Sequence, residues 1–153
     1  MRWDENIRET IVTDAYGYET SYLYDAENYT YRIIYPDHTE EWFFRDDRKN
    51  ITTHIHPDGS EDNYTYDEKD NLLEHIRADG TVVSFEYDAD NNLTAVTDPE
   101  GHRWLRQYDA NGNMILETDP EENETRYRYN DAGLLNQNGD LYGFRYNSVG
   151  ALT

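Results

Sequence analysis

Residues 81–101 read Thr-Val-Val-Ser-Phe-Glu-Tyr-Asp-Ala-Asp-Asn-Asn-Leu-Thr-Ala-Val-Thr-Asp-Pro-Glu-Gly, and this stretch decides the fold. Its first seven residues, up to Tyr87, alternate between the two faces of a β-strand. Tyr87 and Asp88 then open a turn in which Asn91 tolerates a left-handed backbone. Residues 98–101 form a second turn, because Pro presets φ and Gly accepts a positive φ. The stretch therefore predicts two short strands and two turns.

The same pattern recurs along the whole chain with a period of 21 residues. Aromatic–acid pairs or their variants begin at Trp3, Tyr24, Arg45, Tyr66, Tyr87, Tyr108 and Tyr129. A last pair begins at Tyr146, only 17 residues after Tyr129 (146 minus 129), which predicts one shortened hairpin. Because these registers run through the chain, we expect a single repeat array over residues 1–153 with no separate domain or linker.

Two positions of the repeat hold most of the aromatic rings, and we name them column one and column two. Column one is the first residue of each pair, and column two lies two residues earlier. Column two contains Tyr22, Phe43, Tyr64, Phe85, Tyr127 and Phe144, with Arg106 as the exception. Residues two apart share a sheet face, so the columns predict an aromatic ladder that gives order to a chain poor in Leu and Ile.

Turn chemistry and strand alternation together predict the fold class. The Asp of each pair is expected to cap its own turn through its side chain, as an Asx-turn. Helix is disfavoured, because neither strand fits a 3.6-residue period and turn residues recur about every ten positions. We predict an all-β fold in which tandem 21-residue β-hairpins form one long, twisted antiparallel sheet. Equivalent strands of successive repeats should lie about 9.6 Å apart.

The charge balance excludes several classes of partner. The chain has 13 Lys and Arg against 33 Asp and Glu, a formal net charge of −20, and a sequence pI near 4.3. A sequence-independent grip on nucleic acid phosphates or on anionic membranes needs clustered basic residues, so we expect neither. No apolar run approaches the length of a membrane span, and the N-terminal residues do not resemble a signal peptide. Zero cysteines exclude disulfides, thiolate metal sites and a Cys nucleophile.

Two elements of the repeat resemble the Rhs, or YD-repeat, family. Residues 108–114, Tyr-Asp-Ala-Asn-Gly-Asn-Met, match its Tyr-Asp-Ala-x-Gly-x-Leu element, and residues 98–101 match its Asp-Pro-x-Gly element. The resemblance implies a sheet ribbon that winds into a hollow shell around a toxic domain, as in Rhs polymorphic toxins and insecticidal toxin complexes, with related shells in wall-associated proteins and teneurins. The chain has too few repeats to close a shell, and it shows no toxin domain and no self-cleaving core region. We therefore expect a partial shell, either a fragment or a short member whose sheet edges are covered by something else.

Histidines are the first candidates for a metal site. His54 and His56 alternate to one sheet face, and His75 follows His54 by one period. Because matching positions lie about 9.6 Å apart, His54 and His75 are not expected to share an ion. We predict ordinary strand histidines and no metal or cofactor, with His54 and His56 as the candidate ligands. Calcium at the repeated turn aspartates is an alternative to their capping role.

The candidate binding residues are those that break the repeat. Arg45 and Arg106 replace rings in the columns, and Trp42 and Trp104 lie outside both columns. A ligand or partner face is sought first at these four positions, and the alternative is that they fill gaps in the sheet. No Ser lies in a nucleophile-elbow context and no carboxylate pair is singled out by an apolar pocket, so we predict no enzymatic activity.

The function predicted is that of a non-enzymatic structural module, an Rhs-like shell segment associated with bacterial toxin systems. Its partners would be a second copy, further YD repeats, a toxin or another protein. Two alternatives stay open: a binding module that recognises a glycan or a protein through its aromatic acidic sheet, and an acidic partner that neutralises a basic toxin. The resemblance implies a bacterial protein, which is either cytoplasmic or exported by a secretion machine.

Overall fold

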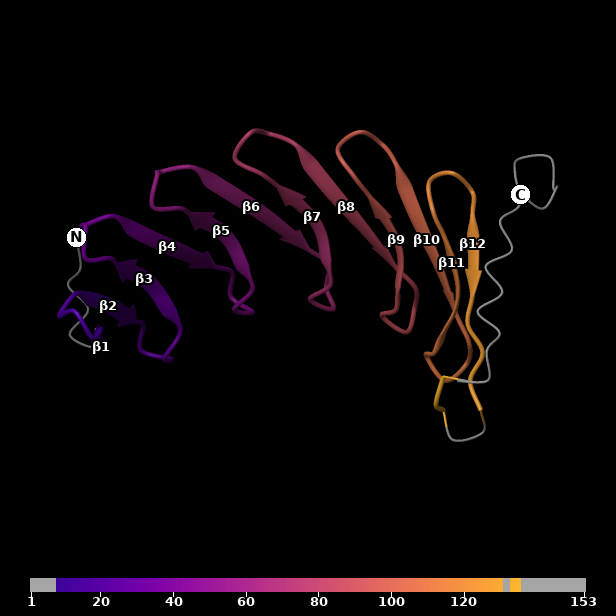
Figure 1. The fold of residues 1–153 in the computed structure, drawn as a ribbon, viewed down its shortest axis with the longest axis horizontal. Coiled ribbons are helices and arrows are strands. Elements are labelled where there is room, and N and C mark those ends of the chain that lie inside the picture. The colour runs from indigo at the N-terminus through magenta and orange to yellow at the C-terminus, as the bar shows by residue number, and fades with distance from the viewer. Residues whose placement is uncertain (1–7, 131–132, 136–153) are drawn as a thin grey trace. The chain divides into compact units, whose positions relative to one another are not determined.

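The computed structural model describes residues 8–130 and 133–135, and this part of the chain is all-β. It contains twelve strands in an open antiparallel sheet in which strand order equals chain order (Figure 1). The strands are β1 (Arg8–Thr13), β2 (Glu19–Tyr24), β3 (Thr30–Ile34), β4 (Glu40–Arg45), β5 (Ile51–Ile55), β6 (Glu61–Tyr66), β7 (Leu72–Ile76), β8 (Val82–Tyr87), β9 (Leu93–Thr97), β10 (Arg103–Tyr108), β11 (Met114–Thr118) and β12 (Glu124–Arg126). The predicted fold class is confirmed. The registers at Trp3 and Tyr146 lie outside the described residues.

The chain divides into two compact units. The first unit comprises residues up to 66 together with 75–81, and the second comprises 67–74 and the residues from 82 onward. Within the first unit β1 pairs with β2, β2 with β3, and so on to β6; within the second, β8 pairs with β9 and the ladder continues to β12. Each hairpin therefore pairs with its neighbours along the chain.

Two turns per repeat carry a residue with positive φ, as the sequence predicts. After each column-one residue these are Asn28, Lys49, Asp70, Asn91, Gly112 and Gly133. In the other turn they are Gly17, His38, Gly59, Gly80, Gly101 and Glu122. The turn at residues 35–39 was not anticipated, because His38 stands where glycine recurs. The predicted left-handed residue Gly150 lies outside the described part of the chain.

A β-bulge beside column one was also not anticipated. The pairing Phe44↔Thr53 is followed by Arg45↔Ile51, which leaves Thr52 without an opposite residue. The same shift leaves Tyr31, Thr94 and Ile115 unopposed in three other hairpins. An unopposed residue disrupts the ladder and bends the strand, so every repeat with this feature has a local kink next to its ring.

Tyrosine hydroxyls of column one bond to the backbone at these bulges. The hydroxyls of Tyr66, Tyr108 and Tyr129 donate to the carbonyl oxygens of Ile51, Leu93 and Met114, at 2.9, 2.8 and 2.9 Å. Ile51, Leu93 and Met114 are the residues at which the register shifts. Each hydroxyl thus satisfies a carbonyl group in the preceding hairpin.

The sheet forms one layer with little fully buried surface. Among the described residues, Ala95 and Leu116 are the buried hydrophobic ones, at 2% and 7% exposure. Ala95 lies opposite Glu86 and Leu105, residues that alternate with the ring columns. The rings themselves are half-buried. The aromatic ladder therefore covers one face of the sheet rather than filling an enclosed core.

Candidate functional site

The carboxylates of the repeated turn aspartates accept hydrogen bonds from groups within their own turns. In the turn at Asp88, one carboxylate oxygen accepts from the backbone N–H groups of Asp90 and Asn92, both at 2.9 Å, and the other accepts from the Asn92 side-chain amide at 2.9 Å. Asp67 and Asp109 repeat this geometry with Asn71 and Asn113. The side-chain amide bonds lower the pKa of each of these three carboxyl groups. The predicted capping role is confirmed, and calcium binding, the alternative to it, stays open.

Trp42 lies on β4 within a small polar–aromatic cluster. The guanidinium carbon of Arg32 lies 4.5 Å from the centroid of the Trp42 ring, and the indole N–H donates to Glu40 at 3.0 Å. The Tyr31 and Phe44 rings lie 6.2 and 6.5 Å from Trp42, centroid to centroid. Because Trp42 alternates with Phe43, this cluster lies on the sheet face opposite the ring columns of its unit.

The other three predicted binding residues lie on the ring-column face. Arg45 donates to the Lys49 carbonyl oxygen at 3.2 Å and its guanidinium lies 5.2 Å from the Tyr29 ring centroid. Arg106 donates to Glu117 at 3.2 Å, and Trp104 lies two residues earlier on the same strand, opposite Val96. Trp42 and Arg45 therefore lie in the first unit, and Trp104 and Arg106 lie in the second. Both arginines donate hydrogen bonds to other residues of the sheet and its turns.

Histidines and acids form a continuous row on the ring-column face of the first unit. We name it the imidazole–carboxylate row, and its members are Tyr35, Glu41, His54, His56, Asp62 and His75. The Tyr35 hydroxyl donates to Glu41 Oε1 at 2.9 Å, and Glu41 Oε2 lies 3.4 Å from His54 Nε2. The His54 and His56 ring centroids are 4.1 Å apart. Oδ2 of Asp62 lies 3.5 Å from His56 Nε2 and 2.9 Å from His75 Nε2.

Strand pairing and ring packing hold this row in place. His54 is directly opposite Phe43 on one side and Asp62 on the other. The Phe43 and His54 rings stack at 4.6 Å, and the Tyr64 and His75 rings stack at 4.7 Å. The second oxygen of Asp62 accepts from the Ala78 backbone N–H at 2.9 Å. Asp62 is 15% exposed, so it is the most enclosed of the row's carboxylates.

Two pKa values in the row are displaced by these contacts. The hydrogen bond with His75 lowers the pKa of Asp62, although burial opposes it. Burial and then the hydrogen bond to Glu41 raise the pKa of Tyr35. The pKa of Asp62 therefore lies below its ordinary value, and its carboxyl group is next to two imidazoles.

The row contains a link between histidines that was not anticipated. His54 and His75 occupy matching positions and were not expected to share an ion, and the structure joins His75 to His56 through Asp62. The acids were missed, although the sequence holds a signal: Glu41 precedes His54 by 13 residues, and Asp62 precedes His75 by the same number. The candidate ligand His54 contacts Glu41, and its role as a metal ligand is untested.

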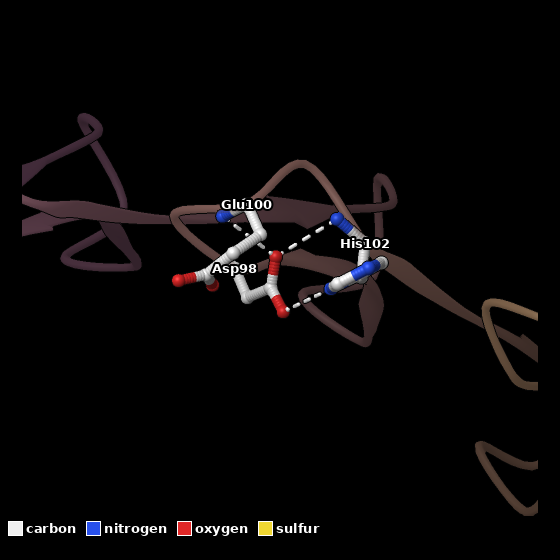
Figure 2. A group of neighbouring side chains, drawn as sticks. All are labelled: Asp98, Glu100 and His102. Atoms are coloured by element: carbon white, nitrogen blue, oxygen red, sulfur yellow. Dashed lines mark hydrogen bonds and ion pairs between the residues drawn. The ribbon is translucent and has the colours of Figure 1, made fainter.

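A second cluster lies in the turn at residues 98–102 (Figure 2). Asp98 accepts from the backbone N–H groups of Glu100 and His102 at 3.0 and 2.8 Å, and its other oxygen lies 2.8 Å from His102 Nδ1. In the part of the chain that the structure describes, this is the group whose three potential ligand atoms all lie within 4.8 Å of one another. The hydrogen bond that His102 donates to the Asp98 carboxylate, and the charge of that carboxylate, raise the pKa of His102.

This turn cluster has an ordinary structural explanation. Asp98 makes the same backbone bonds as the other turn aspartates, and His102 is 60% exposed. The sequence predicts only a turn here, and the alternating Asp-x-Glu-x-His pattern is the signal for the cluster that was missed. Within the described residues no helix is long and apolar enough to cross a membrane.

Comparison with known proteins agrees with the fold. The RHS Repeat family model matches residues 45–82, 66–103, 87–123 and 108–138, which together cover more than half of the chain. A search among curated proteins found no match.

Two solved structures, described as TcdB2-TccC3 and TcdB2-TccC3-Cdc42, superpose with TM-scores of 0.59 and 0.52 at 14% and 12% sequence identity. They cover 73% and 79% of this chain, which spans only 6% and 8% of theirs. The repeat match, together with the observed hairpins and turns, shows that this chain belongs to the RHS repeat family.

Proposed function

We propose that the chain is a non-enzymatic structural module that contributes repeats to an Rhs-type shell of a toxin complex. Family membership and the likeness of its fold to a small part of the TcdB2-TccC3 chains support this proposal. The bacterial origin and the export route expected from the resemblance stay predictions.

The observation that carries the proposal is how the repeat uses its polar groups. The turn aspartates bond to their own backbone and neighbouring Asn side chains, as at Asp67, Asp88 and Asp109. Column-one hydroxyls bond to bulge carbonyls, as at Tyr66 and Tyr108. The turn bonds recur in successive repeats, the hydroxyl bonds are made by Tyr66, Tyr108 and Tyr129, and all of them stabilise the fold itself, as expected of a structural array.

A single-layer sheet also favours association with further protein. Arg8–Thr13 of β1 is exposed at every residue, including Ile11 and Val12 at 53% and 51%. Apolar surface of this kind gains stability when another sheet or strand covers it. The occupant we propose is another set of YD repeats, from a second copy or from a longer assembly.

Gel filtration with light scattering, in low and in high salt, tests the proposal. We expect an ordered dimer or small oligomer that strengthens with salt, because the charge of −20 opposes association at low ionic strength. A monodisperse monomer of 18.2 kDa in both buffers at high protein concentration would contradict it.

The cluster at Trp42 favours a second candidate, a binding module for glycans. Trp42, Tyr31 and the 49%-exposed Phe44 lie beside Arg32 and Glu40, and flat rings next to polar side chains suit stacking on sugars. Titration with soluble oligosaccharides in low and high salt tests this candidate. Salt-insensitive binding that Trp42→Ala abolishes would support it, and salt-sensitive capture of basic proteins alone would favour the neutralising role instead.

A further inference from the structure

We propose that His56, Asp62 and His75 form a binding site for a late first-row divalent metal ion, with zinc as the reference ion. The ligand atoms are Nε2 of the two imidazoles and Oδ2 of the carboxylate. Imidazole nitrogen with carboxylate oxygen is a ligand set that zinc, copper and nickel accept. The site lies in the first unit, where His56 follows β5, Asp62 lies on β6 and His75 lies on β7.

The distances around Asp62 match two edges of a coordination tetrahedron. With metal–ligand distances of about 2.0–2.1 Å, neighbouring ligand atoms of a tetrahedral site lie about 3.3–3.4 Å apart. Oδ2 of Asp62 lies 3.5 Å from His56 Nε2 and 2.9 Å from His75 Nε2, which bracket this value. The third edge is open, because the three atoms do not all lie within 4.8 Å of one another. Metal binding therefore closes the triangle by rotating the imidazoles about their side-chain bonds.

The residues of the row differ from those at the matching positions of other repeats. A binding site needs such a local difference, whereas a purely structural ladder repeats the same residue types. The positions that match His75 in other repeats are Ile33, His54, Val96 and Glu117, and those that match Asp62 include Val83, Trp104 and Thr125. At this pair of repeat positions, an acid contacts an imidazole in two consecutive repeats of the described chain, at Glu41–His54 and Asp62–His75. The next repeat places Val83 and Val96 at these two positions, so the hairpin fold does not need a polar pair there.

The surroundings prepare the ligands for an ion. Asp62 is fixed by the Ala78 N–H through the oxygen that the metal does not use. His75 is held by stacking on Tyr64, and His56 by the adjacent His54 ring. The side chains of His56, Asp62 and His75 are 32%, 15% and 25% exposed, so an ion can reach them from solvent.

Binding exchanges hydrogen bonds for metal–ligand bonds without removing a proton from a neutral ring. In each histidine the proton on Nε2 moves to Nδ1, and the Nε2 lone pair then binds the metal. When a ring is protonated, it must lose one proton to bind. Affinity is therefore expected to fall as the pH drops below the pKa range of histidine.

The turn cluster at Asp98 does not carry the same inference. Its three groups are exposed or half-exposed residues of a single turn, and both Asp98 oxygens already cap that turn. It serves instead as the matched control, because it also combines a histidine with carboxylates.

Calorimetric titration of the full chain with zinc chloride tests the site. We expect one zinc per chain for the wild type, and affinity at least about tenfold weaker for His56→Gln and for His75→Gln, since losing even an outer-shell partner costs that much. His102→Gln should leave the affinity unchanged. Circular dichroism of each variant shows whether its fold is intact. The inference is overturned if the wild type takes up no zinc at millimolar concentration, or if His102→Gln removes binding and the other two variants keep it.

A measurement on the wild type alone can test the proposal even if a variant fails to fold. The X-ray absorption spectrum of the chain with one equivalent of zinc reports the number of imidazole ligands. Two imidazoles with oxygen ligands support the site, because the turn cluster contains only one histidine. One imidazole or none contradicts it.

Discussion

Column one contains tyrosine at positions where phenylalanine would fill nearly the same volume, and the hydroxyl group explains the difference. At three register shifts one strand residue is left unopposed, and the Tyr side chain of the next hairpin reaches the carbonyl oxygen of the residue just before it, as Tyr108 reaches Leu93 beside the unopposed Thr94. A buried or half-buried carbonyl without a partner costs free energy, so the hydroxyl contributes more than ring packing alone.

Replacing Tyr108 by Phe tests this role. The variant keeps the ring but loses the bond to Leu93, so we expect the free energy of unfolding in urea to fall by about 1 kcal/mol. Tyr16→Phe is the control, because Tyr16 is 88% exposed. Equal stability of the two variants would show that the hydroxyl bond contributes nothing.

Asp88 predicts a pH-dependent contribution to stability. Hydrogen bonds from the Asn92 side chain and from the backbone lower the pKa of Asp88 in the folded state. A group whose folded pKa is lowered stabilises the fold fully above its unfolded pKa, about 3.9, and loses this effect as the pH falls through the folded value.

We therefore expect Asp88→Asn to lower the melting temperature at neutral pH and to differ less and less from the wild type below about pH 4. Asp90→Asn removes the same charge from an exposed neighbour in the same turn and serves as the control. A melting difference for Asp88→Asn that is constant from pH 7 to strongly acid solution would rule out the carboxylate as its source.

At the scale of strands and turns, local chemistry decided what could be predicted. The left-handed residues Asn28, Asn91 and Gly112 were predictable, because Asn and Gly accept that backbone conformation within a few residues of sequence. Strand alternation also predicts on which face each tryptophan lies relative to the columns. Trp42 precedes the column-two residue Phe43 by one position and therefore lies on the opposite face. Trp104 precedes position 106 by two and lies on the same face.

The bulges and the imidazole–carboxylate row were not predictable in the same way. Both depend on which residues lie opposite one another across strands, as in the pairs Arg45↔Ile51 and His54↔Asp62. Register depends on the hydrophobic pattern and on the turn type and loop length of each hairpin, which a residue motif alone does not give. The histidines could therefore be singled out by their residue type, whereas the acids that they contact could not.

Left-handed positions occupied by glycine and by asparagine should respond differently to substitution. Gly80 has φ of 82° and open space where a Cβ would lie, so Gly80→Ala should destabilise through backbone strain alone, by about 1–2 kcal/mol. Asn91 already bears a side chain at φ 67°, so Asn91→Gly should be nearly neutral. Urea unfolding of both variants measures the contrast, and equal losses would contradict the strain argument.

At the scale of the whole molecule, the acidic side chains far outnumber the basic ones that could neutralise them. Thirty-three acidic against 13 basic side chains leave a net repulsion in the folded chain. Raising the ionic strength with sodium chloride from about 0.01 M to about 0.15 M shortens the Debye length from about 30 to about 8 Å.

We therefore expect the melting temperature to rise with sodium chloride, and to rise further with zinc at the same ionic strength if the proposed site is present. Magnesium chloride at matched ionic strength is the control for a general divalent effect, because magnesium prefers oxygen ligands. A melting temperature that does not respond to sodium chloride would show that self-repulsion is not a significant cost.

The bulge beside column one has a consequence for how such a protein changes over generations. In the described residues each period contains two strands and two turns, four of the hairpins have the register shift, and left-handed residues return at 17, 38, 59, 80, 101 and 122. Duplication or deletion of the coding sequence for one period keeps the reading frame and returns every later side chain to the same sheet face. The array can therefore become longer or shorter during evolution by whole 21-residue repeats, and the remaining repeats need no compensating substitutions.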